Sequence, residues 1–304
     1  MQKSTKWFLV ISGILFVVGL WLTMFFLILL PSIFDSRSDE IHGSGERVAV
    51  ISLEGPILSS AETVRLFKKY RDDHRVKAIL LRVESPGGGV VASQEIYEEV
   101  RKTRLSGLPV VVSMGAMAAS GGYYVSCAAD RIVANPGTLT GSIGVISQFM
   151  RIDSLLHRIG IEATTIKSGK LKDAGNPFRQ MTQDDRSYFQ DLMDQIHRQF
   201  IDVVARERDI DRDSLLTYAD GRVFTGEAAM AIGLIDTIGT FEDAVEIAGL
   251  LGDIEGPPAH VKERERRPSL FERLLGETRI ADFLSLKDEF LNQPILQYRL
   301  IQSF

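Results

Sequence analysis

The chain has 304 residues, of which 45% are hydrophobic and 25% are charged, and its formal net charge is −5. This length allows one large core or two modest ones, and the slightly acidic balance excludes the basic surfaces by which proteins bind nucleic acid. The only cysteine, Cys127, excludes an intrachain disulfide, and its apolar setting predicts a small buried side chain.

The first predicted element is an apolar helix within residues 1–34. No charged side chain occurs between Trp7 and Phe34, and about 20 such residues span a bilayer. Two lysines precede this stretch, which predicts a cytoplasmic N-terminus and an extracytoplasmic remainder. No small-residue cleavage site is present, so we predict an uncleaved anchor in contact with lipid, in preference to a buried core helix. The polar residues 35–46 are typical of a juxtamembrane linker.

Strands and helices alternate through residues 47–255. Apolar runs predict strands, and helical spacing predicts helices between them, at 47–53, 61–70, 76–85, 90–104 and 109–114. The nearly continuous apolar run at 76–85 is typical of a parallel strand that is buried on both faces. This order predicts an α/β fold, in which sites form at glycine turns beyond the carboxyl ends of the strands.

The pattern changes in the second half of the chain. Residues 161–168 resemble one more strand, and Thr182 and Asp185 form a predicted capping box at the start of a long amphipathic helix that ends near Arg208. Residues 256–304 are predicted to be a charged linker and a separate amphipathic tail. The predicted division is therefore 1–34, 35–46, 47–255 and 256–304.

The segment from Pro109 to Asp130 contains the strongest chemical signal. A β-branched strand leads into small residues around Ser120, and AxSxG differs by one residue from the GxSxG nucleophile elbow. The helix that follows directs backbone N–H groups at the same point, which suits an oxyanion. The simpler alternative is a glycine-rich helix start without chemistry.

A serine nucleophile requires a base, and the sequence favours a lysine. Each of the five histidines lies in a linker or at a charged helical position, and no metal or cofactor motif is present. Lys172 follows the predicted strand at 161–168, and Lys167 and Lys170 are the alternatives. A lysine acts as a base only when neutral, so its pKa must be lowered from about 10.4 by burial.

Three segments resemble the signal peptide peptidase A family, also called protease IV. They are SPGGG at 85–89, SMGAMAASGGYYVSCAADRIVANPGTLTGSIGVI at 113–146 and IKSGKLKDAGNPFRQMT at 166–182. The resemblance implies a fold similar to Clp protease and crotonase, built of repeated ββα units. It also implies that Ser120 is the nucleophile, Lys172 the general base and Ser142 the hydroxyl that positions the lysine amine. The oxyanion donors would be the N–H groups of Gly121 and Gly88, with Gly87 as the alternative to Gly88.

The resulting hypothesis is a serine endopeptidase of the bacterial cytoplasmic membrane, with its catalytic domain on the extracytoplasmic side and no cofactor. Its implied substrates are cleaved signal peptides and unfolded secretory proteins. The resemblance further implies a homo-oligomer in which Ser120 of one subunit is served by Lys172 of the next. Met114, Met117 and Tyr123 are candidate walls of a substrate pocket. The alternatives are a catalytically silent membrane scaffold and an acyl-CoA enzyme on the related fold, and the intact Ser120 and Lys172 argue against the scaffold.

Overall fold

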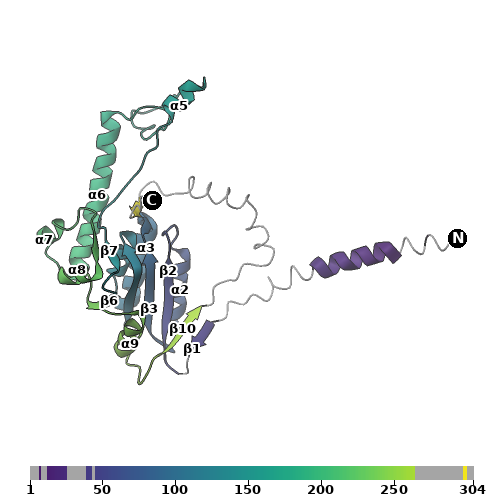
Figure 1. Cartoon of the computed structure of the whole chain (residues 1–304), viewed down its shortest axis with the longest axis vertical. Coiled ribbons are helices and arrows are strands. Elements are labelled where there is room, and N and C mark those ends of the chain that lie inside the picture. The colour runs from purple at the N-terminus through teal and green to yellow at the C-terminus, as the bar shows by residue number, and fades with distance from the viewer. Residues whose placement is uncertain (1–6, 8–11, 26–38, 43–44, 264–296, 300–304) are drawn as a thin grey trace. The chain divides into compact units, whose positions relative to one another are not determined.

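A computed structural model describes residues 7, 12–25, 39–42, 45–263 and 297–299 (Figure 1). Residues 12–25 are helical and belong to the predicted anchor. The rest of that anchor apart from Trp7, residues 35–38 of the predicted linker and residues 264–296 and 300–304 of the predicted tail lie outside the described residues. Within the described ranges, no helix is both long enough and apolar enough to cross a membrane.

The strands and helices follow one another along the chain much as the apolar runs predict. The strands are β1 (Asp39–His42), β2 (Arg47–Glu54), β3 (Val76–Ser85), β4 (Gly87–Gly89), β5 (Val110–Ala119), β6 (Arg131–Ala134), β7 (Leu139–Gly141), β8 (Val223–Thr225), β9 (Thr237–Ile238), β10 (Ala259–Glu263) and β11 (Gln297–Arg299). The helices are α2 (Ala61–Arg71), α3 (Val90–Leu105), α4 (Gly121–Ser126), α5 (Asp153–Arg158), α6 (Gln183–Arg208), α7 (Arg212–Leu216), α8 (Gly226–Ala231) and α9 (Phe241–Leu251).

The core is a parallel sheet in the order β10-β2-β3-β5-β6-β9. Alternate residues of β3 enter two separate hydrophobic clusters. Ile79, Leu81 and Val83 face a large cluster that includes residues of α2, α3, α4 and α6. Ala78 and Leu80 face a smaller cluster that includes residues of α9. Burial on both faces explains the continuous apolar run, because neither face of a central strand contacts water.

Two predicted elements are wrong. Residues 161–168 contain no strand, and Ile166 is 96% exposed. The β-branched pattern of this segment lacks a neighbouring strand to pair with among the described residues, so the local propensity does not prevail. Conversely, part of the predicted C-terminal linker forms β10, which pairs in parallel with β2 and buries Ala259 and Val261. The sheet therefore extends beyond residue 255.

Helix α6 is anchored at one end only. Its first turn has the predicted capping box, with the Asp185 N–H donating to Thr182 Oγ1 at 3.2 Å and the Thr182 N–H donating to Asp185 Oδ2 at 2.9 Å. Near the other end, Phe200 and Val204 are fully buried. The amino-terminal half projects away from the sheet and leads to the segment that carries α5 (Figure 1). We call residues 147–182, which precede α6, the arm.

Phe200 attaches α6 to the helix that follows Ser120. Its ring contacts Tyr124 of α4, with ring centroids 5.1 Å apart. We expect Phe200→Ala to lower the free energy of unfolding by about 3–5 kcal/mol, because it leaves a cavity in the core. Guanidinium unfolding measures this change. Leu250→Ala is the control, since Leu250 is 76% exposed and its loss should change the free energy by less than about 0.5 kcal/mol. Equal effects of the two substitutions would contradict this packing.

Candidate active site

Ser120 lies at a sharp turn between β5 and α4. It has φ 54° and ψ −114°, a backbone conformation that residues with a Cβ rarely adopt. Such strain costs about 1–3 kcal/mol and is retained where the surrounding structure enforces it. Here the enforcement comes from β5, whose last residues are buried, and from α4, which is buried throughout. The predicted strand-turn-helix around Ser120 is therefore present.

The Ser120 hydroxyl is buried and has no hydrogen-bond partner among the described residues. The residue is 1% exposed, and its Oγ is one of the few buried side-chain oxygens that lack a partner. An unpaired buried hydroxyl costs about 1–3 kcal/mol. A group from outside this part of the chain is the natural partner for such an oxygen.

Ser142 lies on the strand end beside Ser120. Ala119 of β5 is paired with Gly141 of β7, and the Ser120 N–H donates to the Gly141 carbonyl at 2.8 Å. Ser142 follows directly, with φ 52° and only 6% exposure, and its N–H donates to the Arg222 carbonyl at 2.8 Å. The structure therefore brings these two predicted hydroxyl residues together through adjacent strands.

The glycines of β4 stand against the nucleophile turn. A Cβ on Gly121 would lie 3.2 Å from the Gly88 nitrogen, so the two backbones are in close contact. The Gly87 N–H donates to Ser85 Oγ at 3.1 Å and is occupied. The Gly87 carbonyl and the Gly89 N–H both bond to Ile57, so the Gly88 N–H must point to the opposite edge of β4. This arrangement favours Gly88 over Gly87 as the partner of Gly121 in an oxyanion hole.

That opposite edge of β4 accepts another strand. β11 pairs with it antiparallel, with Tyr298 opposite Gly88. An extended peptide backbone thus fits beside the glycines that adjoin Ser120, through the same hydrogen bonds that a sheet uses to add a strand. Residues 297–299 belong to the predicted C-terminal tail.

The arm carries Lys172 in a turn, where the sequence predicted the end of a strand. Lys167 forms an ion pair with Asp173 at 2.5 Å, and Lys170 forms one with Asp184. Lys172 has no ion pair or side-chain hydrogen bond with the described residues, and it is exposed. Of the three candidate bases, Lys172 is therefore the one without a carboxylate partner. The burial expected for a lysine base is absent within the chain.

The length of α6 separates Lys172 from Ser120. The imidazole Nε2 of His197 lies 3.2 Å from the Ile143 carbonyl, next to Ser142. Thr182 caps the same helix 15 residues earlier, which is about 22 Å along the axis. The turn with Lys172 is tied to that far end, because Lys170 pairs with Asp184. Within one chain, the Lys172 turn is therefore tied to the end of α6 that lies away from Ser142.

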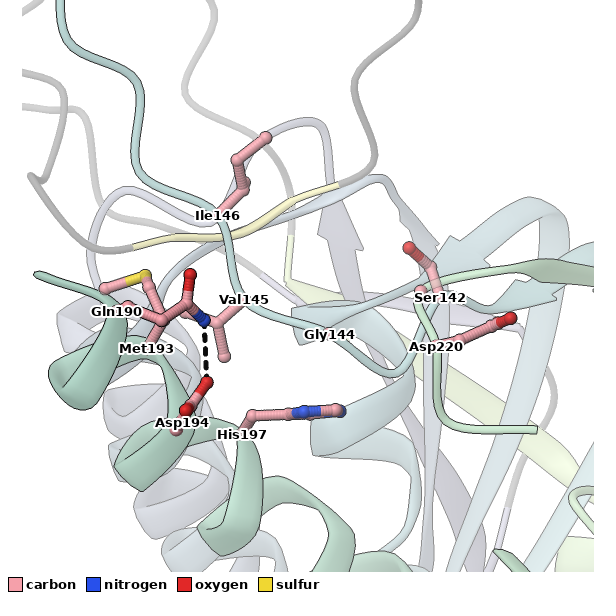
Figure 2. Close-up of a pocket in the computed structure, with 10 residues that line it drawn as sticks. Ser142, Gly144, Val145, Ile146, Gln190, Met193, Asp194, His197 and Asp220 are labelled. Carbon is pink, nitrogen blue, oxygen red and sulfur yellow. Dashed lines mark hydrogen bonds between the residues drawn. The ribbon is translucent and has the colours of Figure 1, made fainter. Parts of the chain in front are cut away.

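A pocket lies between Ser142 and the middle of α6 (Figure 2). Its volume is about 380 Å³, and its wall contains apolar and polar side chains, among them Val145, Met193 and Asp194. His197 also lines it, although the sequence suggested an ordinary surface histidine remote from the glycine turns. Only the fold reveals this position, because 54 residues separate His197 from the Ile143 carbonyl.

The predicted pocket walls are mostly core residues. Met114 and Tyr123 are fully buried, and the Tyr123 hydroxyl donates to the Leu234 carbonyl at 2.9 Å. Met117 is partly exposed and stays a candidate wall.

The remaining candidate groups for chemistry are a thiol and metal ligands. Burial raises the pKa of the Cys127 thiol to about 12, which suits the small buried side chain that the sequence predicts. Within the described ranges, no group of three or more His, Cys, Asp or Glu is placed to hold a metal ion.

Comparison with known proteins shows which family the chain resembles. A family model described as peptidase family S49 matches residues 102–254, a range that encloses Ser120, Ser142 and Lys172. A candidate protease of Synechocystis is 36% identical over 232 residues, which is 76% of this chain and 83% of that protein. A candidate signal peptide peptidase SppA of Enterococcus faecium is 35% identical over 216 residues, or 67% and 63% of the two chains. Protease 4 of Haemophilus influenzae is 36% identical over 213 residues, or 66% of this chain but only 34% of that protein.

Because β4 packs tightly against its neighbours, the role of Gly88 as an oxyanion donor can be tested by adding a side chain. A Cβ at Gly88 would lie 2.2 Å from the Ile57 carbonyl oxygen, so Gly88→Ala must displace β4 and its N–H. We expect kcat to fall by about 10²–10³, the loss typical of one oxyanion donor. Gly137→Ala is the matched control, because a Cβ there meets nothing within 4 Å. Peptide hydrolysis measures both, and unchanged kcat in Gly88→Ala with retained folding would remove Gly88 from the site.

The pairing of β11 with β4 predicts competition with a peptide substrate. Proline has no N–H and fits poorly in a paired strand, so Tyr298→Pro should detach β11 from Gly88. We expect a lower KM for an unstructured peptide and an unchanged kcat. Tyr298→Ala keeps the backbone donor and should leave KM closer to that of the unaltered chain. A KM that is the same in all three proteins would show that β11 does not occupy the substrate edge.

Proposed function

This chain belongs to peptidase family S49 and is a serine peptidase, and we propose that it is a membrane-anchored endopeptidase with a Ser–Lys dyad. The observation that carries the proposal is the buried, unpartnered Ser120 hydroxyl, in a strained turn against Gly88 and Gly121. The proposed fold is of the Clp protease and crotonase type, and the parallel order of the sheet is consistent with it.

In the proposed mechanism, Ser120 Oγ attacks a peptide carbonyl. The Gly88 and Gly121 N–H groups donate to the oxyanion of the tetrahedral intermediate, which is stabilised where negative charge develops. Neutral Lys172 accepts the proton from Ser120 and later returns it to the leaving amine. Ser142 orients the lysine amine through a hydrogen bond, from the strand end beside Ser120.

The base is proposed to come from a neighbouring subunit. Two observations support this arrangement: the end of α6 to which the Lys172 turn is tied lies about 22 Å along the helix axis from His197, which contacts the residue next to Ser142, and the arm exposes large apolar side chains. Met150 is 69% exposed, Ile159 is 60% exposed and Ile166 is 96% exposed. An arm of this kind requires a surface to cover it. Docking of the arm on a second copy would bury Lys172 beside Ser120, which is the burial that a neutral lysine needs.

The proposed substrates are cleaved signal peptides, and unfolded secretory proteins are a second class. A peptide in an extended conformation can pair with β4, as β11 does. The name of the Enterococcus faecium relative is that of a signal peptide peptidase. The apolar stretch 7–34 supports an anchor in the bacterial cytoplasmic membrane, with the catalytic domain on the extracytoplasmic side. Such a domain would meet signal peptides as they leave their precursors.

The shared site is testable by mixing two inactive proteins. We expect Ser120→Ala and Lys172→Ala each to abolish peptide hydrolysis without loss of folding. When the two are dissociated, mixed and reassembled, a Ser120 from one protein can meet a Lys172 from the other. We therefore expect activity to return to about a quarter of that of the unaltered assembly at equal mixing, since each of the two residues is intact in half of the subunits.

The controls distinguish a loss of activity caused by failed assembly from one caused by a missing catalytic group. Each inactive protein reassembled alone should stay inactive, and Ser142→Ala should retain reduced activity because it removes an orienting hydrogen bond and keeps the base. No recovery in the mixture, with full assembly measured by light scattering, would contradict the shared site. Activity of Lys172→Ala near that of the unaltered protein would end the assignment of the base.

A further inference from the structure

The turn that carries Lys172 is held by one arginine whose hydrogen-bonding capacity is fully used. A guanidinium has five N–H donors, and Arg179 makes five hydrogen bonds. Its Nε donates to Asp173 Oδ2 at 2.8 Å, and its Nη2 donates to Asp173 Oδ1 and to the Asp173 carbonyl, both at 2.9 Å. Its Nη1 donates to Asp185 Oδ2 at 2.5 Å and to the Gln180 carbonyl at 3.0 Å.

This arrangement occupies the carboxylate next to Lys172 in the chain. Arg179 contacts both oxygens of Asp173, and Lys167 contacts Oδ1 as well. These two cations, with the Arg179 hydrogen bond as the larger cause, hold the pKa of the Asp173 carboxyl far below its usual range. The Asp173 side chain is only 9% exposed, so water does little to replace either partner. Asp173 is therefore ionised and is paired with cations other than Lys172.

The other end of the arginine is fixed to α6. Asp185 is 1% exposed, accepts from Arg179 and caps the helix together with Thr182. The same Arg179 hydrogen bond is the main reason why the pKa of the Asp185 carboxyl is held far below its usual range. Because the guanidinium is planar, its contacts set both the distance and the angle between the turn and the helix end.

The carboxylates that adjoin this turn, Asp173, Asp184 and Asp185, are each paired with a cation other than Lys172. The charged groups of the arm are Arg151, Asp153, His157, Arg158, Glu162, Lys167, Lys170, Lys172, Asp173 and Arg179, and the first turn of α6 adds Asp184, Asp185 and Arg186. Arg151 pairs with Asp153 on the segment that bonds to Pro177, and the exposed Glu162 makes no ion pair within the described residues. A carboxylate beside an ammonium stabilises the protonated form, which is the inactive form of a base. The pairing pattern therefore leaves Lys172 without the contact that would keep it protonated.

We propose that Arg179 is a positioning residue for the base: it fixes the Lys172 turn on the end of α6 and sequesters the Asp173 carboxylate so that it cannot pair with the Lys172 amine. This inference rests on the proposed role of Lys172. Arg179 itself touches no substrate. Its effect on the reaction passes through Asp173, which makes a definite prediction about pH.

The test compares pH–rate profiles of kcat/KM for the unaltered full-length protein, Arg179→Gln and the double variant Asp173→Asn/Arg179→Gln. Loss of Arg179 frees Asp173 Oδ2, while Lys167 stays on Oδ1, and the freed oxygen can then stabilise the Lys172 ammonium. The limb on which activity rises with pH should then move to higher pH by about 0.5 to 1 unit, which is a loss of about 3- to 10-fold near neutral pH. At the alkaline plateau the loss should be small. The double variant lacks the freed carboxylate, so its limb should return to the position of the unaltered protein.

A merely structural arginine gives a different result. Arg179→Gln would then lower activity by one factor at every pH, and the added Asp173→Asn would not restore the limb. Either outcome, with circular dichroism and assembly size unchanged, overturns the proposal. Arg212→Gln is the matched control, because Arg212 forms an ion pair of 2.8 Å with Asp202 on the opposite half of α6. Its pH–rate profile should match that of the unaltered protein.

Two further variants keep the test decisive. If Arg179→Gln does not fold, Lys167→Gln removes the second cation from the same carboxylate and should shift the limb in the same direction by a smaller amount. An unshifted limb in that folded variant counts against the proposal. The variant Lys172→Ala distinguishes a failure of the proposed function from a failure of the proposed role of Arg179. If it retains activity, the proposed function fails; if it is inactive and the Arg179 profile is unshifted, only the role of Arg179 fails.

Discussion

The length of α6 between the core and the turn that carries Lys172 governs the rest of the functional structure. The helix has 26 residues, about 39 Å at 1.5 Å per residue. Its carboxyl half is fixed in the core by Phe200, and its amino end is fixed to the arm by Arg179. The turn that carries the proposed base is therefore tied to the amino end of α6, away from the end that packs in the core beside the nucleophile turn. This placement supports the proposal that a second chain supplies the base.

The unfavourable free energies at Ser120 are those expected of an active site that lacks one of its groups. Ser120 combines a strained backbone with an unpaired buried hydroxyl, each unfavourable by about 1–3 kcal/mol. The surrounding core tolerates this cost, because β5 and α4 are buried and the Ser120 N–H is bonded to Gly141. A lysine amine that enters from a neighbour would satisfy the hydroxyl. Assembly would then relieve a defect of the isolated chain and complete the catalytic pair in the same step.

The sequence predicted the parts of the structure that depend on local pattern. The buried strands, the capping box at Thr182 and the turn at Ser120 all follow from neighbouring residue types. The errors arise where pairing with a distant segment decides the outcome. Residues 161–168 have strand-like residues and, in the described part of the chain, no strand beside them, whereas β10 has charged neighbours and a partner in β2. The position of His197 in the same pocket as Ser142 likewise depends on how α6 packs against the core, which no local pattern encodes.

The edge of β4 restricts what can reach Ser120. Its three residues are all glycine, so the strand offers a partner peptide its backbone and no side chains. The hydrogen bonds to β4 therefore select for an extended conformation of the peptide, and any preference for its side chains must come from other walls of the site. A folded protein cannot usually present an unpaired extended segment, whereas a released signal peptide or an unfolded chain can. In the proposed mechanism, selectivity would follow from two conditions at once: the substrate must be extended, and a neighbouring subunit must supply the arm with Lys172.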